Sequence, residues 1–134
     1  MSLIVQKFGG SSVSDAEKLK HVAARVLAAQ AAGNKVVVVV SAMGDTTDEL
    51  IDLASSVTTN INGNREMDIL LTAGERISMA LLAMAIKDQG GKAMSFTGYQ
   101  AGISTDSEHG SARIWKIDPV RISQALDEGN IAVV

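Results

Sequence analysis

The sequence has 134 residues, of which 46% are hydrophobic and 20% charged, and its formal net charge is −3. This length suits one domain with a single core, and the composition excludes a disordered chain. The mild acidity gives no general attraction to nucleic acid or to an anionic membrane, so we expect neither as a partner. The chain has no cysteine, which excludes disulfides, thiolate catalysis and cysteine-based zinc sites.

The N-terminus and the hydropathy pattern predict a cytoplasmic protein. Residues 1–7 lack the basic segment and long apolar run of a signal peptide. The longest unbroken aliphatic run, Val36 to Val40, is much shorter than the ~20 residues that span a bilayer. The lack of cysteine fits a reducing compartment, so we expect the cytoplasm.

Two strand–helix units are predicted in succession near the N-terminus. Leu3–Phe8 is an apolar run, and Ser14 with Glu17 forms a capping-box pattern that predicts the start of a helix ending near Gly33. The second unit repeats the order, with a strand at 36–40 and a capping-box pattern at 46–49. Continuous apolarity in the second strand favours a strand covered on both faces, and the alternation favours right-handed βαβ units.

The second half of the chain predicts a long helix and shorter elements. Residues 66–88 form a helical stretch that is apolar on most sides, which predicts burial. Gly74 lies inside it, so we expect either a break into two helices or a close approach of the backbone to a neighbour. Further along we predict strands at 93–96, 113–117 and 131–134, a loop at 98–110, and a helix from Pro119 to Glu128.

The first chemical motif is Lys7-Phe8-Gly9-Gly10-Ser11-Ser12, at a strand-to-helix junction. Two glycines allow a sharp turn that brings backbone N–H groups toward an anion, and Lys7 adds a positive charge. The stretch matches neither a Walker A loop nor the dinucleotide fingerprint. From the spacing alone, a phosphate site and an ordinary βα turn with a surface lysine both stay open.

The second motif, residues 41–48 (SAMGDTTD), follows the predicted strand at 36–40, where open α/β sheets bind ligands. Its hydroxyls and the helix N-terminus can receive a carboxylate, and the alternative is simple helix capping. The third motif, residues 71–78 (LTAGERIS), places Glu75 and Arg76 in an apolar helix. Glu75 facing a ligand amino group and a structural ion pair at a helix or subunit interface both stay open. His21 and His109 are isolated, so no metal site is predicted.

Together these stretches resemble the aspartokinases, which are amino-acid kinases. KFGGSS near the N-terminus, SAMGDTTDEL, LLTAGERIS, SFTGYQAGI and ALDEGNIAVV occur in the order typical of that family, across nearly all 134 residues. The resemblance implies a three-layer α/β/α sandwich with a mostly parallel sheet. It also implies that residues 1–134 form the N-terminal portion of the catalytic domain, since the family's later GF-containing and RGGSD-like segments and its ACT regulatory domains are absent.

The resemblance also implies roles for individual residues. By this resemblance Lys7 contacts the phosphates of ATP and is the catalytic residue, and Glu75 binds the amino group of L-aspartate. The expected nucleotide-side residues are Lys7, Phe8, Gly9, Gly10, Ser11 and Ser12. The expected aspartate-side residues are Ser41, Thr46, Thr47 and Glu75, with one threonine capping the helix while the other binds.

The reaction implied by the resemblance is transfer of the γ-phosphate of Mg²⁺-bound ATP to the β-carboxylate of aspartate. We expect residues 1–134 alone to be inactive, and the full-length protein to be a homo- or hetero-oligomer. Three alternatives remain: another amino-acid kinase acting on glutamate, acetylglutamate or UMP, a nucleotide-binding dehydrogenase domain, and a non-catalytic assembly subunit. The missing GxGxxG pattern argues against the dehydrogenase.

Overall fold

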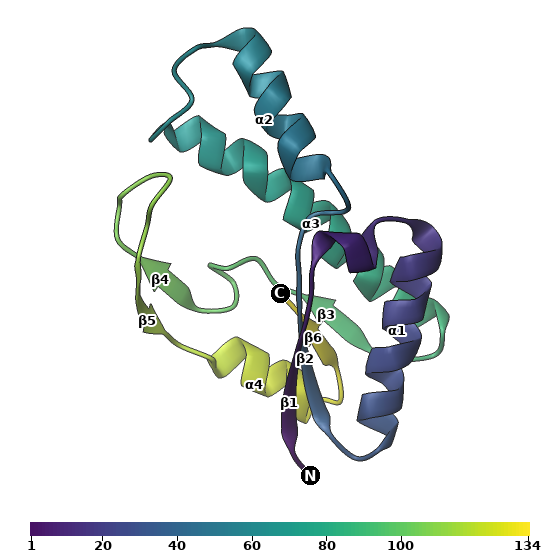
Figure 1. The fold of residues 1–134 in the computed structure, drawn as a ribbon. Coiled ribbons are helices and arrows are strands. Elements are labelled where there is room, and N and C mark those ends of the chain that lie inside the picture. The colour runs from purple at the N-terminus through teal and green to yellow at the C-terminus, as the bar shows by residue number, and fades with distance from the viewer.

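The computed structural model describes all 134 residues and centres on a parallel four-stranded sheet (Figure 1). The strand order is β1-β2-β6-β3, so the last strand lies between the second and the third. All three strand pairings are parallel. The strands are β1 (Leu3–Phe8), β2 (Lys35–Val40), β3 (Ala93–Ser95) and β6 (Ile131–Val133).

Helices cover both faces of this sheet and give the predicted three layers. Helices α1 and α3 lie on one face, and α4 lies on the other (Figure 1). Helix α2 packs against α3 and extends beyond the end of the sheet. The helices are α1 (Ala16–Ala31), α2 (Thr46–Val57), α3 (Arg65–Asp88) and α4 (Val120–Asp127), with a short 3-10 helix η1 (Gly10–Val13) after β1.

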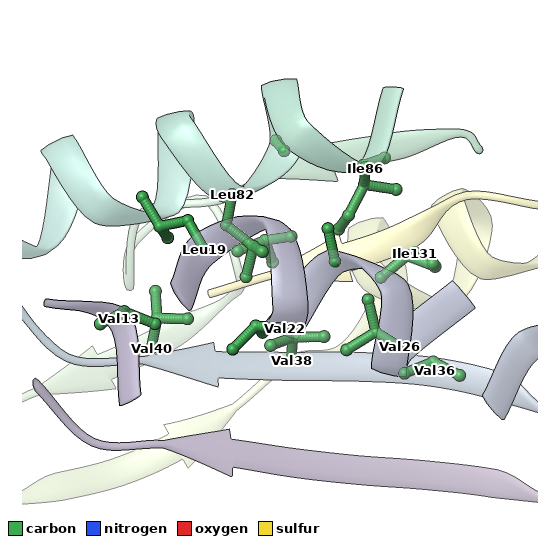
Figure 2. Packing of buried hydrophobic residues seen from close by; sticks show 14 residues of the cluster. Val13, Leu19, Val22, Val26, Val36, Val38, Val40, Leu82, Ile86 and Ile131 are labelled. Atoms are coloured by element: carbon green, nitrogen blue, oxygen red, sulfur yellow. The ribbon is translucent and has the colours of Figure 1, made fainter. Parts of the chain in front are cut away.

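The valine run of β2 explains why both faces are covered. Side chains of a strand alternate between faces, so Val36, Val38 and Val40 pack with α1 and α3, as Figure 2 shows. Val37 faces the other way and packs with Ala132 of β6 and residues of α4. The prediction of a strand buried on both sides is therefore confirmed.

Helix α3 runs without a break from Arg65 to Asp88, straight through Gly74. The prediction that it is buried on most sides is wrong: only one face packs on the core, and Ile69, Ile77 and Met84 are more than half exposed. By length and composition alone α3 could cross a membrane, but its buried face packs against α1 and the sheet, as in the core helix of a globular protein.

Residues 98–110, predicted to be a loop, contain a strand. β4 (Ile103–Thr105) pairs with β5 (Ile114–Ile117) in an antiparallel hairpin separate from the main sheet (Figure 1). Three residues carry too weak a local signal to predict a strand, because a strand forms only where a partner supplies its hydrogen bonds. The other predicted elements lie within a few residues of their observed bounds.

Both capping-box predictions are displaced by one residue. The N-cap of α1 is Asp15, whose Oδ1 accepts from the Lys18 N–H at 2.8 Å, so Ser14 is not the cap. Helix α2 begins at Thr46 itself, after Asp45, and no side chain caps it. Thr46 therefore does not have the predicted capping role.

Candidate active site

The first two motifs meet at the carboxyl edge of the sheet. Parallel pairing continues to the Phe8–Val40 pair, so the segments after β1 and β2 leave the sheet side by side. Two backbone hydrogen bonds hold them together: Ser41 N–H donates to the Phe8 carbonyl at 3.1 Å, and Gly44 N–H donates to the Gly10 carbonyl at 3.0 Å. The turn after β1 and the loop after β2 are therefore one structural unit.

The two glycines of the turn have different surroundings. A Cβ added at Gly10 would lie 2.9 Å from the Ala42 carbonyl oxygen and 3.0 Å from that of Gly44, so only glycine allows this approach. A Cβ added at Gly9 would meet nothing within 4 Å. Gly9 thus leaves open space beside the backbone at the edge where α/β sheets bind ligands.

Lys7 and Phe8 point to opposite faces of the sheet. Phe8 is partly buried and packs against the core beneath α1 and α3. Lys7 is exposed, makes no hydrogen bond or ion pair, and pairs with Val39 on the α4 face. Its ammonium group is free to meet an anion at the carboxyl edge.

The serines after the turn lie in η1 and are exposed. Ser12 N–H donates to the Gly9 carbonyl at 3.0 Å, which closes the turn. The carbonyl of Ser11 accepts from Lys18 Nζ at 3.1 Å, and the same ammonium group donates to Ser14 Oγ at 2.9 Å. Lys18 of α1 therefore stabilises the segment after the turn through these two hydrogen bonds.

The two threonines at the start of α2 differ in what they contact. The Thr46 methyl group faces α3, 3.4 Å from where a Cβ on Gly74 would lie. Thr47 is half-buried, and its hydroxyl makes no hydrogen bond within the chain. Thr46 therefore helps to pack α2 on α3, while the Thr47 hydroxyl is free.

The third motif lies against this loop. A Cβ on Gly74 would lie 2.9 Å from that of Ala42, so glycine lets α3 approach the loop after β2. This confirms the predicted close approach of the Gly74 backbone. Glu75 is half-buried, and neither it nor Arg76 makes an ion pair within the chain, so an ion pair between helices of this chain is not found, while one at a subunit interface stays open.

Two interactions of α3 with other elements were not predicted from sequence. Ser78 is fully buried, and its Oγ donates to the Ser41 carbonyl at 2.6 Å. The only sequence signal of this bond is a serine one turn after Gly74, on the same side of the helix as apolar residues. His109, taken as isolated, lies 2.9 Å from Asp68 Oδ2 through its Nδ1 and ties the β4–β5 hairpin to α3.

Comparisons with known proteins identify the family of this chain. The model of the amino acid kinase family matches residues 2–134. An aspartokinase of Corynebacterium efficiens is 59% identical over the whole chain, and one of Geobacillus stearothermophilus is 56% identical. The chain covers 32% and 33% of these two proteins, about a third of their length.

Solved structures show the same fold. An aspartate kinase from Synechocystis superposes with a TM-score of 0.84 at 43% identity, covering 98% of this chain and 21% of that one. A carbamate kinase from Giardia superposes with a TM-score of 0.66 at 11% identity, covering 98% of this chain and 58% of that one, which shows the fold alone. The chain therefore belongs to the amino acid kinase family, and within that family it is similar to aspartokinases.

Proposed function

We propose that this chain supplies the phosphate- and substrate-binding elements of an aspartate kinase. The reaction is phosphoryl transfer from Mg²⁺-bound ATP to the β-carboxylate of L-aspartate, giving 4-phospho-L-aspartate. The observation that carries the proposal is that two segments meet the loop after β2: the turn that follows Lys7 and contains the open Gly9, and α3 at Gly74, directly before the unpaired Glu75. The similarity to aspartokinases along the whole chain supports the choice of substrate.

The phosphate side of the proposed site is built from residues 7–12. The free ammonium of Lys7 supplies positive charge, and the turn at Gly9-Gly10 leaves room for phosphate oxygens to approach the backbone. Ser11 and Ser12 follow directly and are exposed. Because Lys7 lies on the α4 face, we propose that the nucleotide approaches from that side of the edge.

The aspartate side is built from the loop after β2 and from α3. Glu75 has no partner within the chain, and a half-buried carboxylate without a partner is suited to bind a ligand ammonium group. We propose that Ser41 and the free hydroxyl of Thr47 bind the substrate carboxylates. Thr46, whose methyl packs toward α3, lines this side and contributes mainly by shape.

The mechanism that these residues support is direct in-line transfer. The β-carboxylate of aspartate is ionised near pH 7, so it attacks the γ-phosphorus without a general base. The enzyme has to place two anions next to each other and offset their repulsion. In our proposal Glu75, Ser41 and Thr47 hold aspartate, and Lys7 stabilises the charge that develops on the transferred phosphoryl group.

We propose that Mg²⁺ arrives bound to the phosphate oxygens of ATP. No group of three or more His, Asp or Glu side chains in this chain is arranged to hold a metal ion. Mg²⁺ commonly keeps several waters and binds through substrate phosphates with few protein carboxylates. We propose that the residues of this chain bind the phosphates of ATP and meet Mg²⁺ only through those phosphates.

The test is Lys7→Ala in the complete gene product, assayed by hydroxamate trapping of the acyl phosphate. Loss of one group that stabilises transition-state charge lowers kcat by about 10²–10³-fold. The Lys7 side chain has no hydrogen bond or ion pair to lose, so the melting temperature should stay unchanged. The matched control is Lys20→Ala on α1. Lys20 is also an exposed lysine, and its one ion pair, with Glu17 at 3.4 Å, is on the surface. Near-normal turnover of Lys7→Ala would contradict the proposed role.

Substrate choice is tested separately, because related kinases share the fold. We expect the complete gene product to phosphorylate aspartate and not glutamate, acetylglutamate or UMP. Residues 1–134 alone should show no turnover, since the chain spans about a third of its aspartokinase relatives.

We further propose that the rest of the kinase domain and ACT regulatory domains make up the length that the relatives have beyond this chain. We also propose that the protein is cytoplasmic and acts in the biosynthesis of lysine, threonine and methionine.

Assembly is a second proposed property, and the exposed face of α3 favours it. Ile69, Ile77, Leu81 and Met84 lie on α3 with 51%, 53%, 38% and 63% of their surface exposed. Apolar side chains gathered on one helix face are typical of a surface that another element or subunit covers. Size-exclusion chromatography of residues 1–134 and of the complete gene product tests this. A monomer in both cases would contradict oligomer formation.

A further inference from the structure

Ser78 of α3 is the one polar residue that is buried in this structure. Its Oγ lies 2.6 Å from the carbonyl oxygen of Ser41 and 3.1 Å from that of Glu75. A helical serine commonly bonds a carbonyl of its own preceding turn. Here the shorter bond goes instead to the loop after β2, in a different element, across 37 positions of sequence.

This bond joins two residues that the proposed function places around aspartate. Ser41 begins the loop after β2, and Glu75 lies one turn before Ser78 on α3. One hydroxyl therefore lies between the backbones of both. No other side-chain hydrogen bond connects α3 to the segment from Ser41 to Thr47.

The close contact at Gly74 also joins α3 to the loop after β2. Gly74 and Ser78 are four residues apart, so they lie on the same side of the helix. Gly74 sets how closely α3 approaches Ala42, and Ser78 sets its position along the helix axis relative to Ser41. Glu75 follows Gly74 directly, so these two contacts fix the backbone from which its carboxylate extends.

We infer that Ser78 is a positioning residue, which holds Glu75 and Ser41 at the separation that binding of the amino-acid substrate requires. The inference rests on the proposed function. Ser78 is fully buried and does not touch the substrate itself. Its loss should weaken aspartate binding far more than nucleotide binding, because the turn at Gly9-Gly10 is closed by its own hydrogen bond from Ser12 N–H to the Gly9 carbonyl, which does not involve Ser78.

The experiment compares Ser78→Ala with the wild-type complete gene product. Removing the hydroxyl leaves the part-buried Ser41 carbonyl without this donor and lets α3 shift. We expect the KM for aspartate to rise by about tenfold, the size of effect that loss of one buried hydrogen bond produces. The KM for ATP should change less than twofold. Aspartate binding measured by calorimetry, with no ATP present, should weaken by the same factor as the KM.

The matched control is Ser55→Ala on α2. Ser55 Oγ donates to the Ile51 carbonyl within its own helix at 2.9 Å and is exposed, so both KM values should stay unchanged. If Ser78→Ala does not fold, Ser78→Cys, which is close in size and a weak donor, is judged by the same criteria.

The outcomes separate the two hypotheses. A wild-type protein that neither binds nor phosphorylates aspartate would overturn the proposed function. An active wild type, with unchanged aspartate KM and affinity in the Ser78 variant, would overturn the inference. Equal losses toward ATP and aspartate would also overturn it, because a general structural role predicts them.

Discussion

The close approach of α3 to the loop after β2 makes Gly74→Ala an informative perturbation. In an exposed helix interior, alanine is favoured over glycine by about 1 kcal/mol. At this position, however, the new Cβ would lie 2.9 Å from the Cβ of Ala42. Ordinary carbon–carbon contacts are about 3.5–4.0 Å, so the helix and the loop have to separate by roughly 0.6 Å or more.

The magnitude follows from these two opposing effects. Overpacking of a well-packed contact costs about 1–3 kcal/mol, and the better helix propensity offsets about 1 kcal/mol of it. We therefore expect Gly74→Ala to lower the free energy of unfolding by about 1 kcal/mol. The same shift moves Glu75 away from Ser41, so the KM for aspartate should rise as well. Urea denaturation and hydroxamate kinetics measure the two effects.

A double-mutant cycle isolates the cause. Ala42→Gly removes the methyl group that the new side chain meets. The loss of unfolding free energy in the double variant, Gly74→Ala with Ala42→Gly, should therefore be about 1–2 kcal/mol smaller than the sum of the losses in the two single variants. Ala80→Gly, at an exposed position of the same helix, measures the propensity effect alone. Additive single changes, or a Gly74→Ala variant more stable than wild type with unchanged aspartate KM, would refute the steric argument.

Two further comparisons use neighbouring residues as controls. Gly10→Ala should destabilise the protein by about 1–3 kcal/mol, because its Cβ would meet backbone oxygens, whereas Gly9→Ala should unfold like wild type yet raise the KM for ATP. Equal urea midpoints for the two variants would contradict this. Asp15→Ala should cost about 1 kcal/mol through loss of the helix cap, measured by thermal unfolding. Ser14→Ala, which loses only the exposed hydrogen bond from Lys18 Nζ, should cost less, and the reverse order would show that Ser14 is the cap.

Much of the fold was predictable because its signals are local. The valine run of β2, the glycine turn after β1 and the apolar stripe of α1 each extend over only a few consecutive residues. The predicted parallel sheet followed from their alternation, since helices that connect parallel strands cover both faces. The exact caps were not predictable, because serine, threonine and aspartate compete for the same role at adjacent positions.

The rest depended on pairing and packing between distant residues. β4 exists only because β5 supplies its hydrogen bonds. One face of α3 is exposed because no other element of the chain packs against it. Composition alone suggested a buried helix there. Hydrophobic periodicity does not report how many sides of a helix other elements cover.

The candidate site shows the same division. The sequence by itself determined which residue types are available: a lysine beside two glycines, hydroxyls after a buried strand, and a glutamate after a glycine in a long helix. Only the tertiary structure decided that Lys7 and Glu75 are unpaired, that Thr46 packs on α3, and that Ser78 joins α3 to Ser41. The physical reason is that chemical identity belongs to single residues, whereas a free charge or a hydrogen bond depends on what lies next to them in space.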